Sequence, residues 1–185
     1  MRTLLLGMGN PILSDDAVGV RLAADFARRL RDVPDLVVVP ECTAGGLALL
    51  DVFEGYERAI VLDSVQATPA SPGRWHRFDA CALRESQHLT NVHDANFATT
   101  LELGRRLGIH LPDDSAIHIF AVEVADAVTF SDRMTAPLEA GYPIYSQQIF
   151  NEVLGLLVAP AHGPAPHFPR GWRCTGSSAA TQGSS

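Results

Sequence analysis

The stretch of sequence that decides the fold is LLLGMGNPILSDDAVGVR, which runs from Leu4 to Arg21. Its apolar start predicts a strand. Gly7 and Gly9 then let the backbone bend tightly at the end of that strand. The acidic pair Asp15 and Asp16 follows at the point where a helix should begin. We therefore expect a ligand or metal at the carboxyl end of this strand to meet Asp16.

The acidic pair also has a purely structural explanation. Ser14 or Asp15 can cap the expected helix, and Asp16 falls in its first turn, where a carboxylate complements the helix dipole. On this segment alone, helix capping and ligand binding both stay open.

The rest of the chain alternates between strand and helix signals. Near-continuous apolar runs predict strands at 2–7, 35–41, 58–65 and 115–122, as in a mostly parallel sheet that is buried on both faces. A polar-alternating strand at 73–78 follows a proline-containing turn and is expected at an edge. Helical periodicity is expected at 18–30, 47–53, 93–107 and 135–157. Pro143 is expected to open a second helical piece within the last of these.

This alternation predicts an α/β fold, a three-layer α/β/α sandwich with a mostly parallel twisted sheet of about five strands. The chain has 185 residues, of which 46% are hydrophobic, enough for one domain with a real core. We place that domain at 1–158. Residues 159–185 are rich in proline, glycine and serine, and this composition predicts a disordered tail.

Charge and cysteine content exclude several classes of protein. The net charge of −7 argues against a nucleic-acid or anionic-membrane partner. No apolar run is long enough to span a bilayer, and no signal peptide is recognised at the start. The three cysteines, Cys42, Cys81 and Cys174, form neither a disulfide framework nor a zinc motif. We therefore expect a cytoplasmic protein.

Common catalytic motifs are missing from the sequence. It contains no G-x-S-x-G nucleophile elbow, no H-E-x-x-H zinc helix and no G-x-x-x-x-G-K-[ST] phosphate loop. The glycine turn also fails as a dinucleotide fingerprint, because Ile12 replaces the third glycine and Pro11 lacks the N–H that would hold phosphate. A nucleotide-dependent enzyme is therefore disfavoured.

Three residues remain as candidates for chemistry: Asp16, Asp63 and His93. Asp63 ends the 58–65 strand, and ligands of open α/β sheets gather at the carboxyl ends of strands. His93 stands at a helix start, where the dipole favours a neutral imidazole that binds metal or accepts a proton. Singly, Asp63 could cap loop amides and His93 could be a surface residue. Together they form an O/O/N donor set that suits a first-row divalent metal.

The motifs that contain these residues resemble those of the hydrogenase maturation proteases. The family's opening strand, G-x-G-N and acidic pair correspond here to Gly7-Met8-Gly9-Asn10 and Asp15-Asp16-Ala17-Val18-Gly19. Asp63 and His93 then follow in the family's order, and the resemblance covers about 1–158. It implies an aspartic-type endopeptidase that removes a C-terminal peptide from the nickel-loaded large-subunit precursor of a [NiFe] hydrogenase.

The resemblance further implies that Asp16, Asp63 and His93 are both the catalytic residues and the nickel ligands, and that the substrate supplies the nickel. Whether that nickel is catalytic or only recognised stays open. A non-catalytic nickel-checkpoint module on the same fold is the alternative function.

Two further positions compare loosely with the family. Cys42 departs from it, since the family usually has glycine before the turn Thr43-Ala44-Gly45, whereas Glu123 falls where the family often has an acid. We expect Glu123 to be an exposed loop residue. Four histidines match no family motif and are expected to be structural or exposed: His76, His88, His110 and His118.

Overall fold

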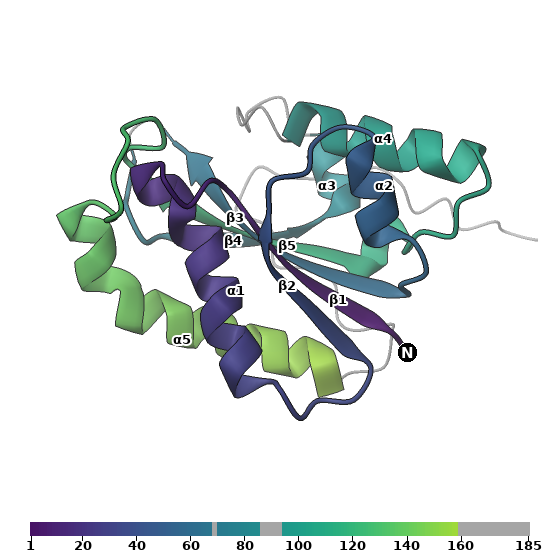
Figure 1. Ribbon diagram of the computed structural model, residues 1–185, viewed down its shortest axis with the longest axis horizontal. Helices are drawn as coiled ribbons and strands as arrows, with labels where there is room; N and C mark the ends of the chain where they lie inside the picture. The colour runs from purple at the N-terminus through teal and green to yellow at the C-terminus, as the bar shows by residue number, and fades with distance from the viewer. Residues whose placement is uncertain (68–69, 86–93, 159–185) are drawn as a thin grey trace, which may run out of the picture.

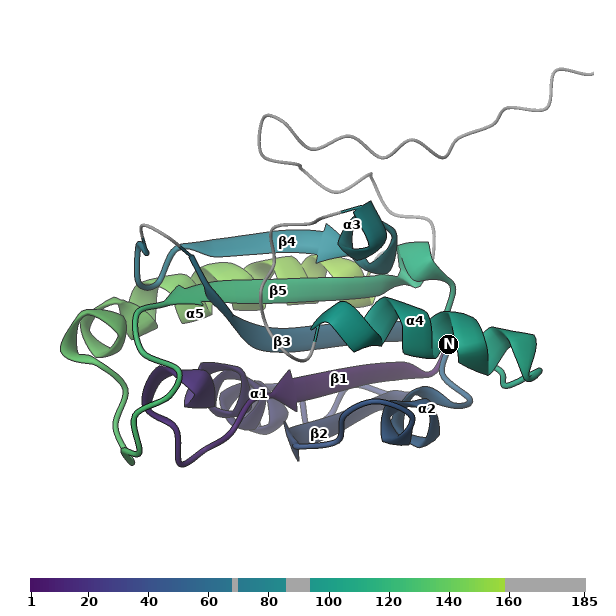
Figure 2. The same cartoon turned by 90° about the horizontal axis from the view of Figure 1, so that it is seen from above.

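The computed structural model describes residues 1–67, 70–85 and 94–158. Its centre is a five-stranded sheet with the strand order β2-β1-β3-β5-β4. The strands are β1 (Thr3–Met8), β2 (Leu36–Cys42), β3 (Arg58–Gln66), β4 (Trp75–Asp79) and β5 (Ile117–Val124). β2, β1, β3 and β5 are parallel, and β4 pairs with β5 in the antiparallel direction. Figure 2 shows β4 at one edge and β2 at the other.

Helices cover both faces of the sheet (Figure 1). One face carries α1 (Val18–Arg29) and α5 (Ala136–Val158), and the other carries α2 (Ala48–Phe53), α3 (Ala80–Glu85) and α4 (Asp94–Arg106). Two short 3₁₀ turns, η1 (Ser14–Ala17) and η2 (Asp114–Ala116), precede α1 and β5. The three-layer α/β sandwich predicted from the sequence is therefore confirmed.

The central strands explain why the sheet has two hydrophobic cores. Every residue of β1 is buried, and its side chains alternate between the faces. Leu4 and Leu6 pack in the core beneath α2, α3 and α4, whereas Leu5 packs beneath α1 and α5. The apolar run is continuous because both faces are covered.

The helices differ from the prediction at two points. α3 was not predicted, because six residues are too few to show a helical period. Pro143 does not open a second piece, because α5 continues through it from Ala136 to Val158. The helix loses one backbone hydrogen bond at the proline, but Tyr142, Tyr145 and Ile149 are buried against the sheet and hold it in place.

A side chain from the sheet holds the last turn of α5 in place. Arg58 of β3 is almost fully buried, and its guanidinium donates a hydrogen bond to the carbonyl of Leu156. A cation at this position also complements the negative end of the helix dipole. None of the helices in the described ranges is long and apolar enough to cross a membrane.

We expect acid to weaken the fold through His118 of β5. Burial, with added repulsion from Arg77 and Arg58, lowers the pKa of His118 from 6.5 to about 4. The unfolded chain binds a proton at His118 at higher pH than the folded chain does. The stability that the neutral imidazole contributes is therefore complete above about pH 6.5 and is lost as the pH falls towards 4. We expect this loss to be about 1–2 kcal/mol in the free energy of unfolding, because water screens the charge on a partly exposed ring.

Urea unfolding at several pH values between 7 and 4 would measure this loss. A His118→Gln variant should flatten the pH dependence in that window, whereas His110→Gln, at an exposed position, should not. Equal slopes for His118→Gln and the parent would contradict the assignment.

The predicted tail, 159–185, lies outside the described residues. We expect a chain that ends after Ala159 to unfold at nearly the same temperature, because the removed sequence has little apolar surface to bury. Differential scanning calorimetry would test this. A fall of more than about 5 °C, on the order of 1 kcal/mol or more for a chain of this size, would contradict it.

Candidate functional site

The motif glycines hold the start of α1 against the ends of two strands. A Cβ on Gly19 would collide with the carbonyl oxygens of Met8 and Leu62, and one on Gly7 would collide with backbone and side-chain atoms of neighbouring elements. Of these three glycines, Gly9 alone has a positive φ, of 124°. Gly9 therefore supplies the bend expected after β1, whereas Gly7 and Gly19 permit the close approach of backbones.

Neither aspartate caps the helix. α1 has Ala17 at its N-cap without a side-chain hydrogen bond, and Asp15 and Asp16 lie in the preceding 3₁₀ turn η1. The capping prediction is therefore wrong. The physical reason is that each carboxylate is held by more distant donors, and the two aspartates have different partners.

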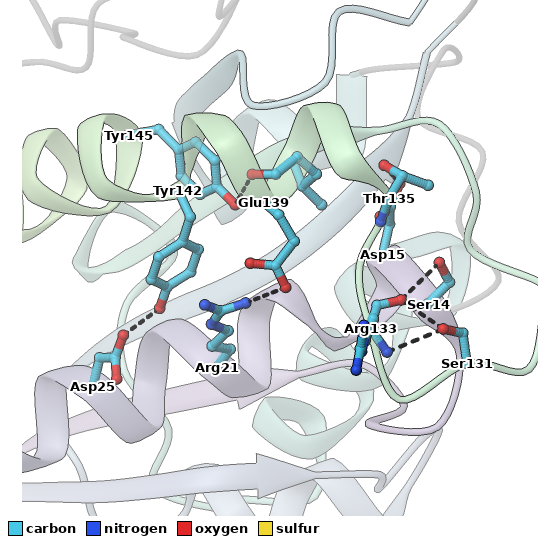
Figure 3. Close-up of polar contacts among 11 residues, drawn as sticks. Ser14, Asp15, Arg21, Asp25, Ser131, Arg133, Thr135, Glu139, Tyr142 and Tyr145 are labelled. Atoms are coloured by element: carbon cyan, nitrogen blue, oxygen red, sulfur yellow. Dashed lines mark hydrogen bonds and ion pairs between the residues drawn. The ribbon is translucent and has the colours of Figure 1, made fainter.

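Asp15 fastens the loop between β5 and α5. Its carboxylate accepts hydrogen bonds from the backbone N–H groups of Ala125 and Asp126, both at 3.1 Å. It also accepts bonds from the N–H of Thr135 at 2.6 Å and from the Thr135 hydroxyl at 3.0 Å. Figure 3 shows Thr135 next to Asp15 at the start of α5. Asp15 is fully buried and is a structural residue.

Asp16 and Asp63 meet at Ser64. The Ser64 hydroxyl donates to Oδ1 of Asp16 at 2.7 Å, and the Ser64 N–H donates to Oδ1 of Asp63 at 2.7 Å. The Asn10 N–H donates to the other Asp16 oxygen, Oδ2, at 2.7 Å. All three members of the Asp16–Ser64–Asp63 cluster are buried. The structure therefore connects Asp16, beyond the carboxyl end of β1, to Ser64, the residue directly after Asp63 on β3.

Sequence reasoning missed Ser64. The only available signal was its position directly after Asp63, and successive strand residues point to opposite faces. The contact arises because η1 places Asp16 over the end of the sheet, within reach of the Ser64 hydroxyl.

His93 lies outside the described residues, so its place relative to the two carboxylates is not described. The helix expected at 93–107 is present as α4, which begins at Asp94. Figure 2 shows that α4 runs towards the end of the sheet where the chain's N-terminus lies. The N-terminal end of α4 therefore points towards the carboxyl side of the parallel strands.

Glu123 is not the exposed loop acid that the sequence predicted. β5 extends to Val124, so Glu123 is a buried strand residue. Its carboxylate accepts a hydrogen bond from the Ser71 N–H at 2.9 Å and lies 2.7 Å from Nε2 of His76. Arg74 lies 3.7 Å away. Glu123 thereby attaches the segment before β4 to β5.

Cys42 ends β2 and pairs with Met8 across the sheet. Burial raises the pKa of its thiol, and this favours the protonated, unreactive form. The thiol is therefore a packing group at this end of the sheet.

Asp16 and Asp63 carry carboxylate oxygens, which are hard donors that suit a divalent cation or a bound water. Within residues 1–67, 70–85 and 94–158, no three His, Cys, Asp or Glu side chains come close enough to hold a metal ion. The third predicted ligand, His93, is not in these ranges.

Comparisons with known proteins agree with the resemblance seen in the motif. No family model matches the chain. The hydrogenase 2 maturation protease of Escherichia coli is 33% identical over 73 residues, which are 40% of this chain and 44% of that protein. The hydrogenase expression/formation protein HupD of Bradyrhizobium diazoefficiens is 38% identical over 73 residues, 40% of this chain and 37% of HupD. The matched segment thus spans less than half of either relative.

Solved structures extend the similarity to the whole fold. The hydrogenase maturating endopeptidase HybD from E. coli superposes with a TM-score of 0.64 at 23% identity, covering 84% of this chain and 93% of HybD. The [NiFe] hydrogenase maturation protease HybD from Thermococcus kodakarensis gives 0.60 at 18% identity, over 82% and 99% of the two chains. The chain is therefore similar in sequence, over 73 residues, to two proteins of hydrogenase maturation, and it shares the fold of the two HybD structures.

Proposed function

We propose that the chain is an endopeptidase that removes a C-terminal peptide from the nickel-loaded large-subunit precursor of a [NiFe] hydrogenase. The observation that carries this proposal is the Asp16–Ser64–Asp63 cluster, in which Ser64 donates a hydrogen bond to each of two carboxylates on a fold shared with E. coli HybD. Its support from sequence is the similarity to two proteins of hydrogenase maturation.

In this proposal Asp16, Asp63 and His93 bind the precursor's own nickel, which arrives as part of the substrate. Carboxylate oxygens and an imidazole nitrogen are suitable ligands for a first-row divalent ion. A nickel ion supplies Lewis acidity towards the scissile carbonyl or an attacking water. Alternatively, Asp16 or Asp63 accepts the proton of that water as a general base.

The donors to Asp16 fix its orientation for either role. The Asn10 N–H and the Ser64 hydroxyl each hold one carboxylate oxygen, so the group is oriented before any substrate arrives. Preorganised polar groups need little rearrangement during the reaction. We place the activity in the cytoplasm, which fits the free thiols of Cys42 and Cys81.

We expect cleavage to require nickel in the precursor. Two carboxylates and one histidine make a three-ligand set, which holds a free divalent ion weakly compared with a closed four-ligand site. The test mixes metal-free protein with precursor purified in nickel-loaded and nickel-free forms, and follows the size of the large subunit by mass spectrometry. Only the nickel-loaded form should be shortened.

Other outcomes have distinct meanings. Equal cleavage of both forms would refute the nickel requirement but not the endopeptidase assignment. Binding of the loaded precursor without cleavage would indicate a non-catalytic checkpoint module. Nickel tightly bound to the isolated protein would point to a carrier or to an autonomous metalloprotease.

A further inference from the structure

Two loops at the site end of the molecule are joined into one unit. The loop after β1 and the loop between β5 and α5 form an isolated antiparallel bridge between Leu13 and Phe130. The Ser131 N–H donates to the Ile12 carbonyl at 3.0 Å, and the Asp15 N–H donates to the Asp126 carbonyl at 3.0 Å. Together with the Asp15 carboxylate, these bonds define the paired loops, residues 10–15 and 125–135.

The paired loops carry three large apolar side chains that face solvent. Ile12 is 56% exposed, Val128 is 73% exposed and Phe130 is 78% exposed. A single exposed apolar residue needs no explanation, but three on one hydrogen-bonded unit are typical of an interaction surface. We call these three residues the apolar rim.

The apolar rim is held in place before any partner binds. The Asp126 carboxylate accepts hydrogen bonds from the N–H groups of Val128 at 3.1 Å and Thr129 at 2.9 Å, which shape the loop that carries Val128 and Phe130. At the other end of this loop, the hydroxyls of Ser14 and Ser131 both donate to the Arg133 carbonyl (Figure 3). A surface ordered in advance loses little conformational entropy on binding, so more of the contact energy becomes affinity.

The rim is continuous with the candidate site through Asn10. The Asn10 N–H holds the Asp16 carboxylate, and the Asn10 side-chain oxygen accepts a hydrogen bond from the Ile12 N–H at 3.2 Å. Because Asn10 contacts both Asp16 and Ile12, a polypeptide bound at Asp16 would lie next to the paired loops.

We propose that the apolar rim docks the folded body of the large-subunit precursor, through an apolar patch beside its cleaved C-terminal segment. This inference rests on the proposed function. The exposed charges of Asp132 and Arg133 flank the apolar side chains, as in protein interfaces with an apolar centre and a polar periphery. The net charge of −7 disfavours an anionic membrane as the occupant. Aromatic and aliphatic anchors of this kind carry a large share of binding energy.

Steady-state cleavage of nickel-loaded precursor tests the rim. Phe130→Ser, alone and with Val128→Ser, should raise KM at least about tenfold and leave kcat within about twofold, because the rim binds the precursor away from the scissile bond. Phe130→Leu should restore most of the loss. Leu107→Ser is the matched control, since Leu107 is 67% exposed between α4 and β5, at the other end of the strands. Melting temperatures of all variants should match the parent.

Each alternative outcome is decisive. If the parent cleaves the precursor and the rim variants show the parent's KM, the rim proposal is wrong and the proposed function stands. If the parent does not cleave, the proposed function fails, and calorimetric binding of the loaded precursor to the parent and to Phe130→Ser still tests the rim. A dimer of the parent that Phe130→Ser dissociates in sedimentation would show a second copy as the occupant and overturn the proposal.

Discussion

Replacement of Asp16 or Asp63 by asparagine should abolish precursor cleavage or reduce its rate by at least about 10²–10⁴-fold, as should His93→Ala. The asparagine side chain keeps the size of aspartate but loses the charge that binds a cation or accepts a proton. Asp16 and Asp63 each accept a hydrogen bond from Ser64, and each substitution removes one of the two negative charges of the proposed ligand set. Rates should be measured by the shift in size of the nickel-loaded large subunit.

The matched control is Asp32→Asn, because the Asp32 side chain is 92% exposed and pairs only with Arg31 on the surface. It should cleave at the parent's rate. The site variants should keep the parent's circular dichroism spectrum, because asparagine still accepts one hydrogen bond from Asn10 or Ser64. Near-normal cleavage by any two of the three site variants would refute the site assignment.

The neighbouring aspartate should behave in the opposite way, with a large effect on stability. Asp15→Ala removes the acceptor for three backbone N–H groups and the Thr135 hydroxyl, in a fully buried position. Buried donors that lose their partner cost about 1–3 kcal/mol each in the worst case, and partial rearrangement recovers some of this cost. We expect a loss of about 3–5 kcal/mol in the free energy of unfolding, measured by urea titration.

Asp15→Asn should cost less, because the amide oxygen still accepts some of these bonds. Asp132→Ala is the matched control on the same loop, where the side chain is exposed, and should change stability by less than about 0.5 kcal/mol. A loss below about 1 kcal/mol for Asp15→Ala would show that the loop does not depend on this carboxylate.

Much of the fold was predictable, because its signals are local. The apolar runs at 2–7, 35–41, 58–65 and 115–122 correspond to β1, β2, β3 and β5, and the polar alternation at 73–78 marked the edge strand β4. Such runs can be recognised in the sequence because the burial of a strand on both faces is reflected in its own apolar residues. α3 and the uninterrupted α5 were not predictable, because tertiary packing outweighs the weak local signal of six residues or one proline.

The different hydrogen-bond partners of Asp15 and Asp16 could not be predicted from the sequence. The two residues are chemically identical neighbours, and their difference lies in partners that are far away along the chain. Thr135 follows Asp15 by 120 positions, and Ser64 follows Asp16 by 48. The family pattern favoured the second acid, and the structure shows that the first acid accepts the hydrogen bonds of the loop before α5. Glu123 was misjudged for the same reason, since His76 and Ser71 contact it only in the folded chain.

The contact of Arg58 with the last turn of α5 has a practical consequence for experiments on surfaces. It places Val158 at the same end of the molecule as the start of β1, whereas the start of α1 and the loop before α5 lie at the opposite end (Figure 1). A tether attached before Thr3 or after Val158 should therefore leave the site and the rim pointing into solution. Immobilised protein, or protein with a fluorophore at either position, can then be used to measure precursor binding without blocking the site or the rim.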